Sequence, residues 1–178
     1  IPSVRWHNNV FYQIWTNAAG GAITINRAEN GRNNATNSQI LNNVFLGCGK
    51  NDQSGWYAIG DNSLIITNTW KVDFNYVAGL DGSPKRVGQP RTNQRWYEPN
   101  GINGGDGRFQ NINLLNFRLL EDSPLRNKGI NLNNYFSIDH DKNNRPLVGN
   151  WDIGAFQFVT STPQTILPPR FKNIIIHP

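Results

Sequence analysis

The sequence predicts an all-β fold built from short strands and sharp bends. Asn accounts for 28 of the 178 residues, whereas Lys and Glu, which usually cover exposed helix faces, are scarce. Aromatic residues make up 11% of the chain while charged residues make up only 16%, which is the reverse of a disordered composition. A mainly helical protein and a disordered chain are therefore both strongly disfavoured.

Runs of β-branched and aromatic residues predict the strands in order, and runs rich in Gly or Asn predict the bends between them. Alternation of apolar and polar residues is clearest from Trp70 to Tyr76. The expected strands lie at 8–11, 22–25, 38–45, 63–70, 70–76 and 109–117, and the expected bends at 17–21, 47–55 and 79–82.

A repeat relates several of these runs. Asn8-Asn9-Val10-Phe11 recurs as Asn42-Asn43-Val44-Phe45, and 38–45 aligns with 63–70, with a looser copy at 109–117. A parallel β-solenoid explains the repeat, because equivalent Asn side chains stack as ladders and Asn tolerates the left-handed backbone that sharp corners need. A jelly roll or another β-sandwich is the alternative fold.

The C-terminal third carries a more specific pattern. Ser123-Pro124 precedes an acidic loop, Asp139-x-Asp141-x-x-x-Arg145-Pro146, and a closing strand, Asp152-Ile153-Gly154-Ala155-Phe156. This pattern resembles the end of right-handed parallel β-helix proteins of the pectate-lyase-like superfamily, in particular the choice-of-anchor Q type. The chain departs from it at 125–129 and at Gln157, where Glu is common, so any role that needs those acids is not expected here.

The resemblance implies a right-handed parallel β-helix in three parts. Residues 1–120 are expected to form coils, with a long insertion at 81–108. Residues 121–158 are expected to form a capping region in which Trp151 and Phe156 cover the end of the apolar interior. Residues 159–178 are expected to be a linker and a truncated strand. Ile1 opens directly into a coil-like segment, which suggests the last coils of a longer β-helix or an end covered by another chain.

Charge and motif content narrow the function classes. The net charge of +5 favours anionic partners weakly, but the basic residues are scattered and no nucleic-acid-binding motif occurs, so nucleic acid is not an expected partner. No apolar stretch is long enough to span a bilayer, so no membrane insertion is expected. The single Cys48 is expected to be a buried and unreactive thiol.

The insertion supplies the candidate ligand-binding residues. Sugar rings stack on Trp and Tyr, and Arg binds carboxylate or sulfate groups with two parallel hydrogen bonds. We therefore expect a polysaccharide, with anionic groups favoured, to contact Lys85, Arg91, Arg95, Trp96 and Tyr97. The alternative is that Trp96 and Tyr97 only pin the insertion to the coils. Trp56-Tyr57 is a second aromatic pair, for which core packing is favoured.

No cofactor is predicted. Asp139, Asp141 and Asn143 have the alternate spacing of calcium ligands, but the Gly and Glu of a calcium loop are missing, and a turn network of Asp and Asn side chains is favoured over a calcium site. The His residues lack partners at metal-ligand spacing. No pair of acids is oriented by the sequence alone, so catalytic residues are not assigned.

Three functions remain open from the sequence. The first is an extracellular or surface-exposed β-helix segment that engages polysaccharide, as part of a larger carbohydrate-active or adhesive protein. The second is a structural protein of a virion, appendage or filament. The third is a catalytic fragment of a polysaccharide lyase or glycoside hydrolase, classes that the resembled superfamily includes.

Overall fold

The computed structural model describes residues 3–14, 21–25, 37–49, 57–61, 70–88 and 98–160. Within these ranges the secondary structure is nearly all β, which confirms the all-β prediction. The helical element η2 (Ile112–Leu114) is a single 3-10 turn.

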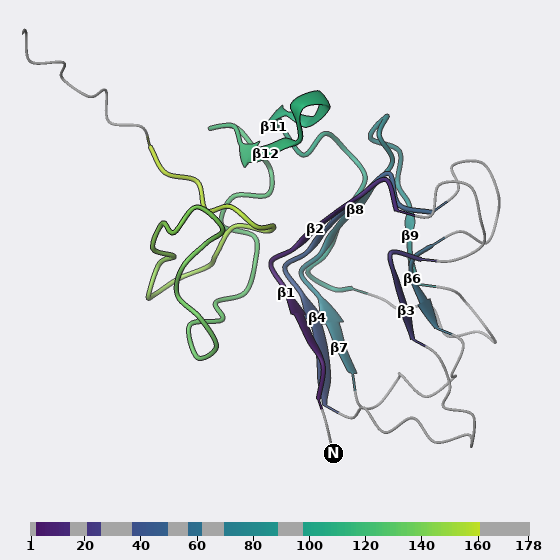
Figure 1. Cartoon of the computed structure of the whole chain (residues 1–178), viewed down its shortest axis with the longest axis horizontal. Helices are drawn as coiled ribbons and strands as arrows, with labels where there is room; N and C mark the ends of the chain where they lie inside the picture. The colour runs from purple at the N-terminus through teal and green to yellow at the C-terminus, as the bar shows by residue number, and fades with distance from the viewer. Residues whose placement is uncertain are drawn as a thin grey trace, which may run out of the picture.

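Three parallel sheets surround an apolar interior (Figure 1). Sheet A contains β1 (Arg5–His7), β4 (Ser38–Leu41) and β7 (Trp70–Asp73). Sheet B contains β2 (Val10–Tyr12), β5 (Val44–Leu46), β8 (Tyr76–Ala78) and β10 (Ile102–Asn103). Sheet C contains β3 (Ile23–Ile25), β6 (Tyr57–Asp61) and β9 (Arg86–Gly88). From β1 to β9 the chain visits sheets A, B and C in turn and then returns to A.

The register confirms one predicted repeat and corrects the other. Val10 pairs with Val44 and Phe11 with Phe45, so the two Asn-Asn-Val-Phe copies are stacked. The predicted alignment of 38–45 with 63–70 is wrong, because Trp70 pairs with Ser38 rather than with Phe45. The next copy is Phe74-Asn75-Tyr76-Val77, in which Tyr76 pairs with Val44.

Large apolar side chains fill the space between the sheets. Phe11 stacks on Phe45 with ring centroids 4.8 Å apart, and Phe45 and Ile40 are fully buried. Cys48 lies in the same cluster, and burial raises the pKa of its thiol to about 11. The thiol is therefore protonated and shielded from solvent, which agrees with the buried, unreactive thiol predicted from the sequence.

The corner between sheets A and B has the same backbone conformation in successive coils. Asn8, Asn42 and Phe74 have φ of 53°, 59° and 59°, all in the left-handed region. Asn adopts this conformation more easily than other residues with a side chain, which explains the Asn at the first two corners. Phe74 takes it without that advantage, and its N–H is held by Asp73 Oδ1 at 2.8 Å.

The next residue at each corner forms a hydrogen-bonded ladder of side chains. Asn9 Nδ2 donates to Asn43 Oδ1 at 3.0 Å, and Asn43 Nδ2 donates to Asn75 Oδ1 at 3.0 Å. Asn75 Nδ2 then donates to Glu98 Oε1 at 2.9 Å. The backbone N–H of each Asn donates to the same acceptor side chain as its amide. All these donors point the same way along the stack, and a carboxylate accepts the last pair.

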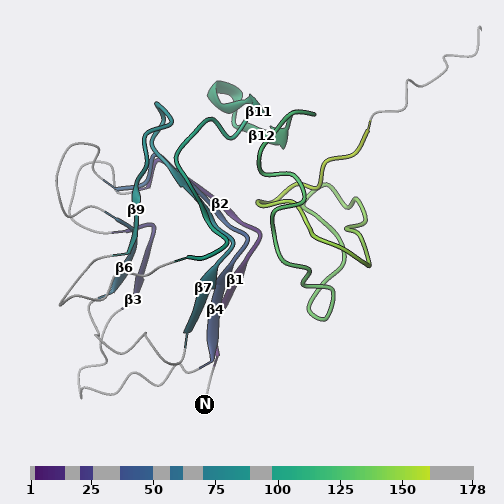
Figure 2. The same ribbon diagram turned by 180° about the vertical axis from the view of Figure 1, so that it is seen from behind.

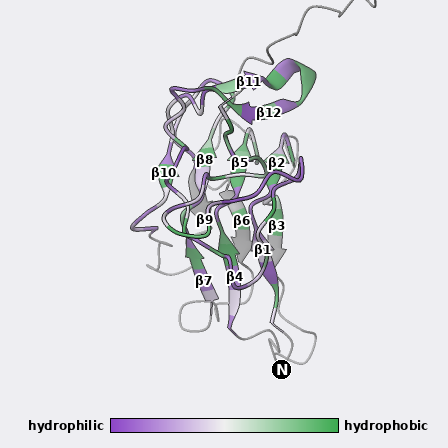
Figure 3. Cartoon of the chain, turned by 90° about the vertical axis from the view of Figure 1, so that its left-hand side faces the viewer, coloured by the Kyte–Doolittle hydropathy of each residue, from purple (hydrophilic) through white to green (hydrophobic). Residues whose placement is uncertain are grey.

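Sheet B is apolar on both faces. Phe45 and Val77 face the interior, whereas Val44, Leu46 and Tyr76 belong to a second cluster on the outer face. That face is covered by β11 (Phe109–Asn111), η2 and β12 (Asn116–Leu119), with β11 and β12 paired antiparallel. Residues 109–119, which the sequence placed among the coils, are therefore an outer hairpin. Figure 3 shows the strands of sheet B side by side beneath it.

The C-terminal region, 121–158, also lies outside the sheets, beside the corner between A and B (Figure 2). Trp151 and Leu132 pack on Leu41, whose side chain points away from the interior cluster, and Asn42 exchanges hydrogen bonds of 2.8 Å with the backbone of Ile130. We expected Trp151 and Phe156 to cover the end of the interior. Trp151 instead packs on Leu41 at the end of β4, and Phe156 lies against His140 and Arg118. Leu125 and Ile153 of the same region cover the outer face of sheet B.

Candidate functional site

Most of the predicted binding residues lie outside the described ranges, namely Arg91, Arg95, Trp96 and Tyr97. Trp56 is also outside them, and Tyr57 is described only as backbone in β6. Lys85 is described and partly buried, and its backbone N–H donates to Asn103 Oδ1 at 2.9 Å. Within the insertion, the structure therefore describes only the two ends, 81–88 and 98–108.

The two ends of the insertion meet on the outer side of sheet B. Gly104 N donates to Val77 O at 2.9 Å as β10 adds to β8, and Gly105 N donates to Gly82 O at 2.8 Å. Gly82 has φ of 77°, and a Cβ there would lie 3.3 Å from the carbonyl oxygen of Gly105. Glycine thus permits both the turn and the close approach of the two backbones.

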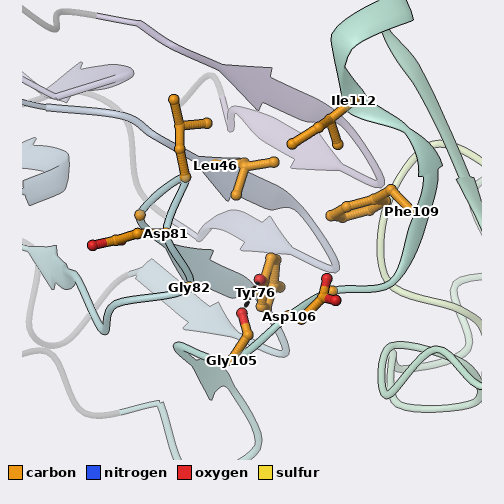
Figure 4. Close-up of a pocket in the computed structure, with 11 residues that line it drawn as sticks. Leu46, Tyr76, Asp81, Gly82, Gly105, Asp106, Phe109 and Ile112 are labelled. Atoms are coloured by element: carbon orange, nitrogen blue, oxygen red, sulfur yellow. Dashed lines mark hydrogen bonds between the residues drawn. The ribbon is translucent and has the colours of Figure 1, made fainter.

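A cavity of about 460 Å³ lies where these ends reach the outer hairpin (Figure 4). Its apolar wall is formed by Leu46, Tyr76, Leu80, Phe109 and Ile112. The two glycine-rich turns contribute the other lining residues, Gly79, Asp81, Gly82, Gly105, Asp106 and Gly107. An apolar and aromatic surface facing a few fixed polar groups is the usual composition of a small-ligand site.

The polar groups of the cavity are held in place by their own turns. Tyr76 Oη donates to Gly105 O at 2.6 Å, and Arg108 N donates to Asp106 Oδ1 at 2.8 Å. Burial, with a smaller contribution from the Asp106 charge, raises the pKa of Tyr76 to about 12. The Tyr76 hydroxyl is therefore a fixed, neutral group, and the other oxygen of Asp106 lies 3.8 Å from the Arg108 guanidinium.

Asp81, like Asp106, accepts a hydrogen bond from the backbone N–H two residues later, but its carboxylate points in a different direction. Ser83 N donates to Asp81 Oδ1 at 3.0 Å, and hydrogen bonds from Ser83 lower the pKa of the Asp81 carboxyl. Figure 4 shows the Asp81 carboxylate turned away from Tyr76, whereas Asp106 lies close to it. Asp106 is thus the carboxylate that faces the aromatic wall, and Asp81 places a second negative charge at the rim.

The acidic loop in the C-terminal region forms a hydrogen-bond network. Asp139 accepts from Asn143 N at 2.8 Å, from Asn143 Nδ2 at 3.1 Å and from Gln157 N at 2.8 Å. Asp141 instead forms a two-bond ion pair with Arg118, at 2.6 and 2.7 Å, which lowers the pKa of Asp141. Asp139 and Asp141 therefore serve different partners, and their oxygens already have protein donors.

The other residues of the C-terminal pattern brace the same region. Arg145 is 2% exposed, lies over the Trp151 ring at 5.1 Å, and donates to Gly154 O at 3.0 Å. Burial lowers the pKa of Arg145 to about 10, still far above neutral, so the guanidinium stays charged. Asp152 accepts from the backbone N–H groups of Asn127 and Phe158 at 2.7 and 2.6 Å. These contacts explain the Asp, Arg and Asp of the pattern as structural residues.

Glu98 is the polar residue that sequence reasoning missed. It lies partly buried at the end of the Asn ladder, and desolvation raises the pKa of its carboxyl to about 7. Hydrogen bonds from Asn75 act in the opposite direction, and the Asp73 carboxylate adds to the increase. Both Asn75 donors occupy Glu98, so it terminates the ladder and does not face the cavity.

Comparisons with known proteins give no relative for this chain. No family model matches it, and neither the curated proteins nor the solved structures contain a significant match. Across the described residues, no group of three or more His, Cys, Asp or Glu side chains is placed to hold a metal ion. Within the same ranges, no helix has the length and apolarity needed to cross a membrane.

Proposed function

We propose that the chain is a segment of a right-handed parallel β-helix that engages polysaccharide outside the cell or at its surface. Parallel pairing of β1, β4 and β7, with sheets B and C visited between them, supports the solenoid. The hand follows from the strong preference of parallel crossover connections for right-handed paths. A rigid stack of this kind holds inserted loops in fixed positions, where binding residues concentrate.

The observation that carries the binding function is the cavity between the two ends of the insertion and the outer hairpin. Its aromatic residues, Tyr76 and Phe109, offer apolar surface to a sugar ring, and Asp106 offers an acceptor for sugar hydroxyls. The cavity lies at the base of the insertion that carries Arg91, Arg95, Trp96 and Tyr97.

Binding fits the cavity better than hydrolysis does. Glycoside hydrolysis usually needs two carboxyl groups on opposite sides of one bond. Of the two carboxylates among the described lining residues, Asp106 alone faces the aromatic wall, because the carboxylate of Asp81 accepts from Ser83 N in its own turn and points away from Tyr76 (Figure 4). A binding or adhesive role is therefore the function that the geometry supports best.

The test is glycan binding by the wild-type chain and by matched variants. Asp106→Asn and Leu80→Ala change the cavity, whereas Glu121→Gln removes an exposed negative charge outside it. We expect weaker binding for the first two variants and unchanged binding for the third, with melting temperatures equal to that of the wild type. Arg95→Ala and Trp96→Ala test the rest of the insertion. Binding that is insensitive to all four changes in the cavity and insertion would refute the proposed site.

A structural role is the second candidate, and one observation favours it. Among the described strands, β1, β2 and β3 are each the last of their sheet, so three parallel edges lie at the same end of the stack. Edges of this kind can pair with a further coil or with another chain. Sedimentation and electron microscopy separate the two candidates, because filaments or oligomers that form without glycan favour assembly, whereas a monomer that binds glycan favours recognition.

A further inference from the structure

The cavity has a pronounced charge asymmetry. Among the described residues that line it, the charged ones are Asp81 and Asp106, and none is Lys or Arg. This contrasts with the whole chain, in which basic residues exceed acidic ones by five. The local charge, and not the net charge, decides which groups can be buried against the aromatic wall.

Arg108, the described cation next to Asp106, already pairs with another carboxylate. Arg108 Nη2 and Nε donate to Asp122 at 2.7 and 3.2 Å, which leaves Asp106 with a 3.8 Å contact to Nη1. Lys85 attracts the Asp81 carboxylate from the same end of the insertion. Neither cation lines the cavity, so neither is placed to accept an anionic ligand there.

Asp106 is fixed so that it can accept hydrogen bonds. One of its oxygens is held by Arg108 N, and its side chain remains 73% exposed. The Tyr76 hydroxyl beside it has already donated its proton to Gly105 O. A ligand in the cavity therefore meets acceptors, and groups that donate hydrogen bonds satisfy them.

We infer that the cavity selects an uncharged or amine-bearing sugar unit and discriminates against uronate and sulfated units. This inference rests on the proposed function. The sequence predicts an anionic glycan, whereas the inference applies only to the single sugar unit that enters the cavity, which we expect to carry no negative charge. A carboxylate or sulfate on the bound ring would lie against Asp106, and no cation among the described residues of the cavity wall would offset the repulsion. Hydroxyl and ammonium groups would instead donate to the Asp106 oxygen.

The test uses matched oligosaccharides with gluco, galacto and manno configuration, each with a hydroxymethyl group or a carboxylate at the same carbon, together with the 2-amino forms. Binding is measured by calorimetry at low salt with the wild-type chain, Asp106→Asn and Glu121→Gln. We expect the carboxylate form to bind on the order of tenfold more weakly than its neutral partner, as like-charge repulsion at a partly exposed site implies. Salt should reduce this difference, because the site is open to solvent.

The Asp106→Asn variant should lose most of the discrimination while keeping its turn, because Asn can still accept from Arg108 N. Glu121→Gln should keep the discrimination in full. Uronate forms that bind as tightly as neutral forms, or more tightly, would overturn the selectivity and leave polysaccharide binding intact. Absence of binding by every member of the panel would overturn both the selectivity and the proposed function.

Discussion

Glu98 gives a quantitative test of how the stack is terminated. Its carboxylate accepts the backbone N–H and the side-chain amide of Asn75 at 3.0 and 2.9 Å, and it lies near the Asp73 carboxylate. Desolvation raises its pKa from 4.5 to about 7. A folded-state pKa above the unfolded value means that the folded state holds a proton that the unfolded chain has lost.

The sign of the pH dependence follows directly. The contribution of Glu98 to stability is fully present below pH 4.5 and is lost as the pH rises through about 7, because ionisation then places a charge in a desolvated site. At 1.36 kcal/mol per pKa unit, the shift corresponds to about 3 kcal/mol of unfolding free energy lost between pH 4.5 and 8. This is a large part of the 5–15 kcal/mol that stabilises a typical domain.

The measurement is urea denaturation of the wild type and Glu98→Gln at half-unit pH steps from 4.5 to 8. Gln cannot ionise, so the stability difference between the two proteins isolates the titration of residue 98. The comparison also cancels His7, whose pKa is lowered by burial and whose effect has the opposite sign, since its contribution is lost as the pH falls. A difference that stays constant over this range, or that grows in favour of the wild type as the pH rises, would refute the reasoning.

Three further predictions concern the ladder, the C-terminal region and the interior. Asn43→Ala should lower the free energy of unfolding, measured by urea denaturation, by about 3 kcal/mol, because it leaves buried donors and acceptors of the neighbouring Asn residues unpaired. The control Asn113→Ala, at an exposed residue, should lower it by less than about 0.5 kcal/mol. Leu125→Ala should lower the free energy of unfolding by about 2–5 kcal/mol, since Leu125 is fully buried beside sheet B. The control Leu147→Ala, at a residue that is 71% exposed, should change it little. Equal losses for the two variants would contradict the packing of the C-terminal region on sheet B. Cys48 should react with a thiol reagent at neutral pH only as fast as the chain unfolds, and rapid labelling of native protein would show that it is not buried.

The part of the fold that sequence predicts best is the part built from short, local rules. The Asn-Asn-Val-Phe repeat located two stacked corners correctly, because the left-handed corner and the ladder require the same residue type in each coil. The third copy was missed since Phe74 replaces the first Asn and Tyr76 replaces Val. The spacing also changes, with equivalent Asn residues 34 and then 32 residues apart, so a fixed period does not find it.

The last residue of the ladder, Glu98, could not be predicted from the sequence for a different reason. Glu98 accepts hydrogen bonds from Asn75 across only 23 residues, and it is an acid in place of an amide. The last residue of the ladder only has to accept hydrogen bonds, so a residue other than Asn can occupy that position. The signal that remains in the sequence is a lone Glu between an aromatic run and a Pro-Asn-Gly turn, which no local rule assigns to a ladder.

The placement of the C-terminal region depends on contacts between residues far apart in the chain. Asn8 donates to the carbonyl oxygens of Asp152 and Gly154 across 144 and 146 residues. The composition of sheet B contained a usable signal, because Val44-Phe45-Leu46 and Tyr76-Val77-Ala78 are apolar without alternation, as expected for strands buried on both faces. A second apolar face requires a lateral cover, and this is the position that the region occupies.

The candidate site, too, could be predicted from the sequence only in part. The sequence indicated the insertion at 81–108 as the place for binding, and its two described ends do line the cavity. It could not indicate Leu46, Tyr76 or Phe109, because these residues reach the cavity from sheet B and the outer hairpin. The pairing of β8 with β10, together with the hydrogen bond from Gly105 N to Gly82 O, brings the two glycine-rich turns together.

One measurement tests directly whether stacked coils build a sugar site from the two ends of the insertion. Amide chemical shifts of the isotope-labelled chain are followed by NMR during titration with the neutral oligosaccharide that binds best. We expect the amides of Gly82, Gly105 and Gly107 to shift together with a single dissociation constant, although the two turns are distant in sequence. Shifts confined to one turn, or changes elsewhere with both turns unaffected, would contradict the account.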